Sequence, residues 1–364
     1  MVRLLRQALV AADVRPGPVV VACSGGPDST ALMLAIALLA KSRGLQPHVV
    51  CIDHQLRADA AIEAQQVVDV ATRLGMTAQG LRVQVVAGPS KQAQARAARY
   101  AALLDVAERW GAAWICLGHT RDDQAETMLM RWLGGAGTRG LAGMKPVARP
   151  PLATSSRVRL LRPLLAVSRE QISAFLGHAT SLVSPLPCDD PSNRDARYLR
   201  SRLRHEVLPA LRRVAPQLDA HLLELSEQLA RDADCLDALA EHALASLLRS
   251  ARVLPPSLPE VQERLAISVQ ALTAWPYAIT ARVLRRLLGP GLGGRHVTAL
   301  LSLCTGSSGR KWLDLPGCGR VERSRDWLLL TQWASPDPSA QAGAPPWLLD
   351  ALVKQTLDGC DADA

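Results

Sequence analysis

The chain has 364 residues, enough for two or three domains, and 48% of them are hydrophobic while 21% are charged. This balance supports a packed core and argues against extended disorder. A net charge of +9 favours a polyanionic partner, although arginine-rich compositions also arise in some lineages without one. Only 3% of the residues are aromatic, so arginine rather than base stacking would carry most of the affinity for RNA.

The sequence lacks the marks of export or membrane insertion. Its longest apolar run, at 31–40, is too short to cross a bilayer, and no apolar segment with a small-residue cleavage site opens the chain. The eight cysteines are scattered and form no C-x-x-C pair, which argues against a zinc site or an iron–sulfur cluster. We therefore predict a cytoplasmic protein with no membrane partner.

Strands and helices alternate through the first half of the chain. Apolar runs predict buried strands at 19–22, 48–53, 81–86 and 113–117. Helix-forming segments follow them at 31–40, 58–74, 90–110 and 121–133. This alternation produces βαβ units, so we predict an α/β fold with a doubly wound parallel sheet. Ligands of such sheets bind at the carboxyl ends of the strands, where the strand order reverses.

The segment between the first strand and its helix is rich in small residues and reads Ser24-Gly25-Gly26-Pro27-Asp28-Ser29. The two glycines leave room for a ligand against the backbone, and the N-terminus of the following helix offers free N–H groups to an anion. No Gly-Lys-Ser/Thr follows, so this is not a Walker A loop, and the third glycine of a dinucleotide fingerprint is missing. The segment predicts a phosphate-binding loop; the alternative is a plain glycine turn.

Two other strand ends bring polar residues to the same crevice. Asp53 and His54 follow the second strand, and His119 follows the fourth. The next helix carries Asp123 and Glu126 on one face, because they are three residues apart. Two carboxylates would normally repel a phosphate bound beside them. Their presence is explained if magnesium joins them to the phosphates or if they hold a cationic substrate. The alternative is that they only complement the helix dipole.

Arginines gather in two places. Arg96 and Arg99 are three apart on the helix predicted over 90–110, and planar guanidinium groups suit a phosphate or a tRNA backbone. A second stripe has apolar residues four apart that turn its arginines away from the core, and it contains Arg194, Arg197, Arg200, Arg202 and Arg204. For both groups the alternative is a solvated surface.

The second half of the chain has a different pattern. Leucines at helical spacing predict a helical module from 216 to about 288, and apolar runs around Gly317–Gly319 predict a terminal hairpin. We therefore predict a catalytic domain over 1–214 and a helical tRNA-contacting domain over 215–334 that ends in the hairpin. Residues 335–364 would form a linker and tail. The glycine-rich segment 134–140 is either a connector or a mobile active-site loop.

Seven motifs, taken together in their order along the chain, narrow the resemblance to one family. The loop at 24–29 by itself resembles the ATP pyrophosphatase, or PP-loop, superfamily. After it come Cys51–Arg57, Ala95–Tyr100, His119–Thr127, Gly140–Met144, Arg162–Leu165, and Asp190–Asn193 with Arg200. The full set resembles the tRNA(Ile)-lysidine synthetase family over residues 10 to 215 and more weakly beyond.

The resemblance implies a fold and a reaction. The fold would be Rossmann-like, of the adenine nucleotide α-hydrolase type, followed by a smaller helical domain. The reaction would use ATP and magnesium to adenylate the wobble cytidine of a tRNA(Ile) whose anticodon is CAU, with release of pyrophosphate. The ε-amine of free L-lysine would then displace AMP and give lysidine.

The residue patterns and the resemblance together predict the site. Residues expected to hold ATP are Ser24, Gly25, Gly26, Pro27, Asp28, Ser29, Asp53, His54 and His119. Those expected to be catalytic are Asp28, Asp123, Glu126 and Arg200, with Arg200 stabilising negative charge during transfer. Asp123 and Glu126 are also the predicted magnesium ligands. The tRNA would contact Arg96, Arg99, Arg194, Arg197, Arg202 and Arg204.

The sequence departs from the family pattern in places. Thr120 stands where many relatives have a second histidine, and Ser201 replaces a common asparagine. Longer family members carry a further C-terminal domain, and we expect this chain to be a short form, for which family precedent allows a monomer or a homodimer.

Two rival functions stay open on the sequence. A tRNA sulfurtransferase with the same loop should carry paired cysteines, which this chain lacks. A non-catalytic nucleotide- or RNA-binding module would release no pyrophosphate.

Overall fold

The computed structural model describes residues 1–53, 60–84, 91–151, 156–187, 198–254, 261–289, 292–306, 311–315 and 319–333. Three residues of the predicted site, His54, Arg194 and Arg197, lie outside this part of the chain, as does the predicted tail over 335–364. The chain forms two compact units, Met1–Ala230 and Arg231–Ala364, and each is described by itself.

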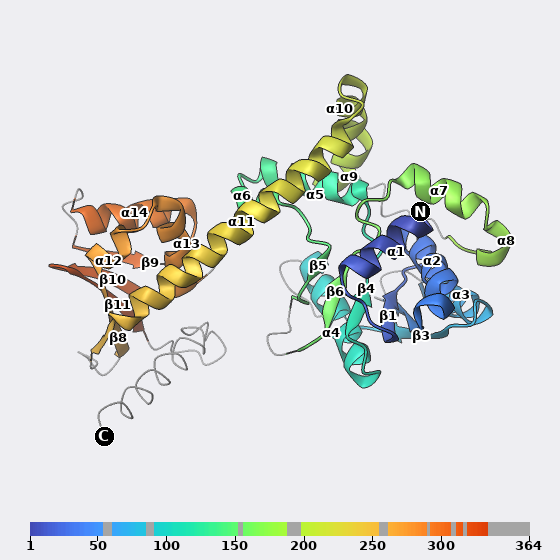
Figure 1. Cartoon of the computed structure of the whole chain (residues 1–364), viewed down its shortest axis with the longest axis horizontal. Coiled ribbons are helices and arrows are strands. Elements are labelled where there is room, and N and C mark those ends of the chain that lie inside the picture. Colours follow the sequence, from blue (N-terminus) through green and yellow to red (C-terminus); the bar gives the residue numbers. More distant parts are fainter. Residues whose placement is uncertain are drawn as a thin grey trace. The chain divides into compact units, whose positions relative to one another are not determined.

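The first unit is built on a six-stranded sheet in the order β3-β2-β1-β4-β6-β5 (Figure 1). Neighbouring strands are parallel except for β5, which is antiparallel to β6. The strands are β1 Gly17–Ala22, β2 Leu45–Asp53, β3 Thr77–Arg82, β4 Trp114–Cys116, β5 Val147–Ala148 and β6 Arg159–Leu161. The predicted α/β fold with a parallel sheet is confirmed.

Helices connect and flank these strands. They are α1 Val2–Ala11, α2 Pro27–Arg43, α3 Ala60–Arg73, α4 Lys91–Arg109, α5 Arg121–Leu133, α6 Thr138–Leu141, α7 Arg169–Gly177, α8 Thr180–Val183, α9 Leu199–Arg202 and α10 Leu208–Val214. A π-helical segment, Leu203–Val207, joins α9 to α10. Helix α5 begins and ends at the predicted residues. The third strand begins earlier than predicted, because β3 lies at the sheet edge, where polar side chains are tolerated and give no apolar run.

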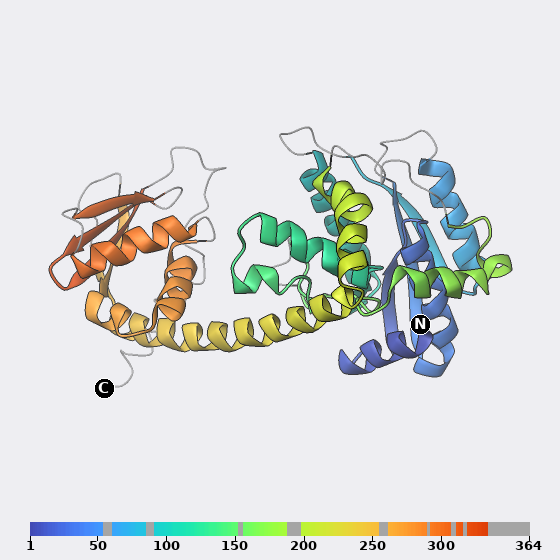
Figure 2. The same ribbon diagram turned by 90° about the horizontal axis from the view of Figure 1, so that it is seen from above.

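Both faces of the sheet are covered, as a doubly wound fold requires (Figure 2). Successive side chains of β1 point to opposite faces. Val19 and Val21 lie in a core cluster with α1, α2, α3 and α7, whereas Val20 lies in a second cluster with Leu103 and Val106 of α4. The continuous apolar runs of the central strands follow from this two-sided burial.

The strand order reverses between β1 and β4, and this point positions the site. β1 pairs with β2 on one side and with β4 on the other. The carboxyl end of β1 leads into residues 23–26 and α2, while the end of β4 leads through Gly118 into α5. A Cβ added to Gly118 would come within 3.0 Å of Ser29 Cα and 3.1 Å of Ser29 N. Only glycine therefore allows the two strand ends to approach this closely.

The second unit contains helices and an antiparallel sheet. Helix α11, Leu218–Arg249, runs across the division between the units, and α12 Val269–Thr273, α13 Tyr277–Leu288 and α14 Gly294–Thr305 follow. The sheet order is β7-β8-β11-β10-β9. Its strands are β7 Arg252–Leu254, β8 Val261–Ser268, β9 Trp312–Leu315, β10 Gly319–Ser324 and β11 Trp327–Trp333.

Some elements of the second unit were predicted correctly from the sequence and others were not. The helices are confirmed. The apolar runs predicted to form the terminal hairpin are strands β9 and β11, but β10 lies between them and pairs with both, so the two runs are not hairpin partners. The expectation of helix through 252–254 and 261–268 is wrong, because β7 and β8 are strands of the same sheet. Leu265 and Ile267 alternate into the core of this unit opposite Leu328 and Leu330, a two-residue period that the surrounding leucines hide. No helix in the described part of the chain is long and apolar enough to span a membrane.

Gly118→Ala tests the close approach at the strand ends. The added methyl group would push against the backbone of Ser29, so we expect a loss of about 1–3 kcal/mol in the free energy of unfolding and at least about tenfold weaker ATP binding. Thermal unfolding and calorimetric titration with ATP measure both. The matched control is Gly177→Ala at the end of α7, where the new Cβ meets nothing within 4 Å. Equal behaviour of the two variants would contradict the prediction.

Candidate active site

The predicted phosphate-binding loop, Ser24–Ser29, lies between β1 and α2 and is held by its own hydroxyl groups. Gly25 has a positive φ of 82°, and Gly26 precedes α2 without any side-chain cap on the helix. Ser29 Oγ donates to the carbonyl of Gly26 at 3.0 Å and accepts from Ser24 N at 3.2 Å. The first-turn N–H groups of α2 thus stay available to an anion, in a loop whose shape is already fixed.

The acid pair Asp123 and Glu126 lies on the buried side of α5. Asp123 closes a capping box with Thr120, whose backbone N–H donates to its Oδ2 at 2.9 Å. Glu126 is fully buried, with a relative exposure of 0%. A buried carboxylate is unfavourable unless cations and hydrogen bonds compensate for the lost hydration.

Two arginines from the segment 199–207 supply that compensation. Arg200 donates from Nε to Glu126 at 2.7 Å and from Nη2 to Asp123 at 2.8 Å. Arg204 donates from Nε to Glu126 at 2.6 Å. Burial by itself would lower the pKa of Arg204, but Glu126 and Asp123 hold it above the usual value. Arg204, predicted to face tRNA, is thus directed into the acid pair, while Arg202 is exposed beside Glu206.

A third arginine, Arg169, links the acid pair to the phosphate-binding loop. Its Nη2 lies 3.5 Å from both Asp123 Oδ1 and Glu126 Oε1, and its Nε lies 3.9 Å from Asp28 Oδ2. Burial and the negative charge of Asp123 raise the pKa of Asp28 to about 6, against the attraction of Arg169 and Arg204. The acids predicted from two parts of the sequence, the loop and α5, therefore meet at one point.

Asp122 holds the surrounding elements together. Its Oδ2 accepts from the backbone N–H of Arg169 at 3.1 Å, and its Oδ1 accepts from Arg212 at 2.7 Å. Arg212 also bonds Asp219 at the start of α11. These contacts lower the pKa of Asp122 in spite of its burial. Helices α5, α7, α10 and α11 are joined around one carboxylate.

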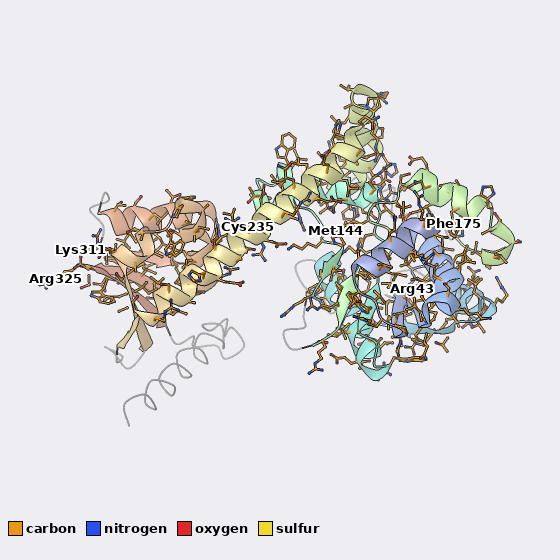
Figure 3. All side chains as sticks on the ribbon, viewed as in Figure 1. Arg43, Met144, Phe175, Cys235, Lys311 and Arg325 are labelled. Carbon is orange, nitrogen blue, oxygen red and sulfur yellow. The ribbon has the colours of Figure 1, made fainter. Side chains whose placement is uncertain are left out.

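Gln124 fixes the residues that follow the glycine-rich segment to α5. Its amide exchanges two hydrogen bonds with the backbone of Met144 (labelled in Figure 3), at 2.8 and 3.2 Å, and donates to Ser226 Oγ at 2.6 Å. Gly143 has a φ of +67°, and a Cβ there would lie 2.5 Å from the amide. Gly140–Met144 is therefore fixed to α5, whereas the choice between connector and mobile loop for 134–140 stays a prediction.

His119 lies among arginines at the end of β4. Burial and the positive charges of Arg162, Arg96 and Arg99 lower the pKa of His119 to about 3, so its ring is neutral at physiological pH. Its Nδ1 is buried and has no hydrogen-bond partner within the described ranges. Arg96 donates to the hydroxyl of buried Tyr100 at 3.2 Å. The predicted nucleotide residue His119 and the predicted tRNA residues Arg96 and Arg99 thus share one corner.

The remaining predicted residue of the described part, Asp53, is buried at the end of β2. Its carboxylate lies 3.8 Å from Arg82 Nε at the end of β3. This places Asp53 at the carboxyl edge of the sheet, with the loop and His119.

The contacts of Asp123 and Glu126 do not fit their predicted role as magnesium ligands. Both oxygens of Glu126 and both of Asp123 accept N–H or O–H groups, so the acid pair as arranged does not suit a metal ion. Asp28 Oδ1 is different, since it is buried and has no hydrogen-bond partner among the residues described. A carboxylate oxygen of this kind fits a hard cation that also binds phosphate. No group of three or more His, Cys, Asp or Glu in those ranges could hold a metal ion by itself.

Comparisons with known proteins agree with this geometry. The PP-loop domain family model matches residues 3–211. A tRNA(Ile)-lysidine synthase of Salinispora tropica is 40% identical over 93% of this chain and 96% of its own, and one of Thermobifida fusca is 40% identical over 86% and 91%. This chain belongs to the tRNA(Ile)-lysidine synthase family.

The solved structures show the fold of this lysidine synthase family member more distantly. The U34-tRNA thiolase NcsA from Methanococcus maripaludis, determined with its [4Fe-4S] cluster, is similar with a TM-score of 0.52 and 14% identity, over 63% of this chain and 77% of that one. At this identity the likeness concerns the fold alone.

Several residues of the site were not predicted. Arg169, Arg212 and Asp219 are ordinary helix residues in the sequence, and Gln124 stands unmarked between the two acids. Their partners lie up to 141 positions away in the chain, as with Asp28 and Arg169 (169 minus 28). The only local signal was the capping box of Ser168 with Gln171, which marks where α7 begins but not what Arg169 faces.

The pKa of Asp28 predicts a pH-dependent stability. Because it lies near 6 in the folded protein, above the ordinary 3.8, stability is lost as pH rises through this interval, and the loss is complete above it. Asp28→Asn should raise the free energy of unfolding at pH 7.5 by up to about 2–3 kcal/mol. The gain should shrink below pH 6 and vanish near pH 4, as urea unfolding at several pH values would show. Asp13→Asn, at an exposed carboxylate, is the control. A gain that is independent of pH would contradict this assignment.

Proposed function

We propose that this chain joins L-lysine to the wobble cytidine of CAU-anticodon tRNA(Ile), with ATP converted to AMP and pyrophosphate. The observation that carries the proposal is the meeting of the phosphate-binding loop and a buried acid pair at the guanidinium of Arg169. Arg169 is therefore close both to the proposed adenylating centre and to the proposed site for a cation. Sequence identity of about 40% to lysidine synthases over most of the chain supports the same function.

The reaction has two steps. The cytidine O2 attacks the α-phosphorus of ATP, the bond from this phosphorus to the β-bridging oxygen breaks, and pyrophosphate leaves with the electron pair. The neutral ε-amine of lysine then attacks C2, the C2–O2 bond breaks, AMP leaves with that oxygen, and the amine loses its proton. Both steps need negative charge to be stabilised on phosphate and a correctly placed amine.

We assign the triphosphate to the loop Ser24–Ser29 and to the N-terminus of α2. ATP would enter as its magnesium complex, and Asp28 Oδ1 is the carboxylate oxygen best suited to the ion. Asp53, His54 and His119 would contact the nucleoside part from the other strand ends. Neutral His119 acts there as a hydrogen-bonding group rather than as a charge.

We assign an ammonium group of lysine to Asp123 and Glu126. Burial of Glu126 in a pocket of arginines makes the site selective for a cation that can replace one of their contacts. Arg200 and Arg204 would hold the pair in place before lysine binds. That Arg200 also stabilises charge during transfer remains a prediction.

The tRNA would bind along the basic residues of the first unit, with Arg96, Arg99, Arg194, Arg197 and Arg202 as its predicted contacts, and on the second unit. Arg204 is not retained among these contacts, because it bonds Glu126. A tRNA substrate supports the predicted cytoplasmic location. The homodimer allowed by family precedent stays a prediction that sedimentation would test.

Incorporation of labelled lysine tests the function directly. With ATP and magnesium, CAU-anticodon tRNA(Ile) should acquire label, whereas the similar elongator tRNA(Met) should not. Filter-bound radioactivity and pyrophosphate release are measured together. Pyrophosphate release without lysine incorporation would overturn the lysine assignment and favour another nucleophile, such as sulfur. Absence of both would favour a binding module.

Two variants should separate the two halves of the site. Asp28→Ala should lower pyrophosphate release at least about a hundredfold. Glu126→Gln should raise the KM for lysine at least about tenfold while ATP binding changes less, because the charge that recognises the ammonium is removed. Glu108→Gln, at an exposed position on α4, is the control. If Glu126→Gln left the lysine dependence unchanged, Glu126 would not belong to the lysine site.

A further inference from the structure

Arg169 differs from the other arginines around the acid pair in how little of its bonding capacity is used. Arg200 and Arg204 donate to carboxylates at 2.6 to 2.8 Å. The guanidinium of Arg169 approaches its three acids only at 3.5 to 3.9 Å. Its Nη2 is buried without a hydrogen-bond partner in the part of the chain that the structure describes. A buried N–H group of this kind is costly unless a ligand supplies the acceptor.

The backbone of Arg169 is held firmly, so this loose contact is not a result of a mobile segment. Its N–H donates to Asp122, and Arg121 N donates to the carbonyl of Val167 at 3.0 Å. Ser168 caps α7 in a capping box with Gln171. Helix α5, which carries the acid pair, thus also fixes the residue whose side chain reaches toward the phosphate-binding loop.

The missing acceptor must be an anion that fits beside Asp28. Arg200 and Arg204 are already neutralised by Asp123 and Glu126, whereas the guanidinium of Arg169 faces the loop acid and the acid pair together. A phosphate group in the loop would bring its oxygens to this side of Asp28, and guanidinium N–H groups are suited to phosphate. Because Arg169 lies at the border of the proposed lysine site, the phosphate that it meets would be the α-phosphate of ATP, which becomes joined to cytidine.

We propose that Arg169 is a further catalytic residue, which donates to a non-bridging oxygen of the α-phosphate during adenylation; this inference rests on the proposed function. As the cytidine O2 bonds to the α-phosphorus and the bond to pyrophosphate breaks, negative charge on the non-bridging oxygens must be stabilised. A guanidinium that is already positioned and has an unused N–H group stabilises it without reorganisation.

The test compares Arg169→Ala and Arg169→Lys with the parent enzyme in single-turnover pyrophosphate release, with CAU-anticodon tRNA(Ile). At saturating ATP, Arg169→Ala should be slower by about a hundredfold and Arg169→Lys by less. The KM for lysine should change less than about threefold, because the direct contacts of the acid pair remain. Arg15→Ala, an exposed arginine, is the matched control. Thermal unfolding verifies that each variant is folded.

A sulfur substitution separates direct contact from a structural role. The two diastereomers of adenosine 5′-(1-thiotriphosphate) each replace one non-bridging α-oxygen. One should slow the parent enzyme by about tenfold or more, and this additional effect should disappear in Arg169→Ala, because the contact is already lost. Arg169→Lys, which keeps the charge and disturbs the fold least, allows the same comparison if the alanine variant does not fold.

The outcomes are distinct. A parent enzyme that incorporates no lysine would refute the proposed function itself. If the parent is active, two results would each overturn the role of Arg169: unchanged pyrophosphate release in Arg169→Ala, or a sulfur effect of equal size in variant and parent.

Discussion

The buried carboxylate of Glu126 is the constraint on which the rest of the site depends. It lies on the inner side of α5 with no exposed surface, where an isolated negative charge would be strongly unfavourable. Arg200 and Arg204 compensate for it, and in doing so they fix the path of the segment 199–207 against α5. The same arginines reach Asp123, so one ionic network sets both the geometry of the acids and the position of the basic segment.

The arginines of this network differ in how tightly they are bonded to the acids. Two of its arginines are tightly bonded, while Arg169 is close but weakly engaged. In the proposed function, a cationic substrate would replace a guanidinium contact at the acids, and a phosphate would bind Arg169 without breaking a strong bond. The raised pKa of Asp28 belongs to the same network, because burial and the negative charge of Asp123 outweigh the attraction of Arg169 and Arg204.

The backbone explains why the ionic network and the phosphate-binding loop can meet. Reversal of strand order between β1 and β4 leaves a crevice at their carboxyl ends, and Gly118 allows the start of α5 to approach the start of α2. Gln124 and Asp122 then join α5 to Met144, Arg169, Arg212 and Ser226. Buried polar contacts of this kind tie distant segments to one helix, so that the acids cannot move independently of the elements around them.

The sequence by itself determined the local features of this protein. The β-branched run before Ser24, the glycines of the loop, and the three-residue spacing of Asp123 and Glu126 each depend on neighbouring residues, so their strand, turn and helix could be predicted. It also predicted that the carboxyl ends of the strands would share a site, because parallel sheets always bring them to one edge. Strand β8 was missed because its pairing depends on β11, which lies more than fifty residues away, and β7 in turn pairs with β8. Only the tertiary structure decided that Arg204 faces the acids, that Arg169 lies between Asp28 and Glu126, and that Gln124 supports Met144. Charge and hydrogen-bond partners come from residues far apart in the chain, and no local pattern specifies which of many arginines will compensate a buried carboxylate.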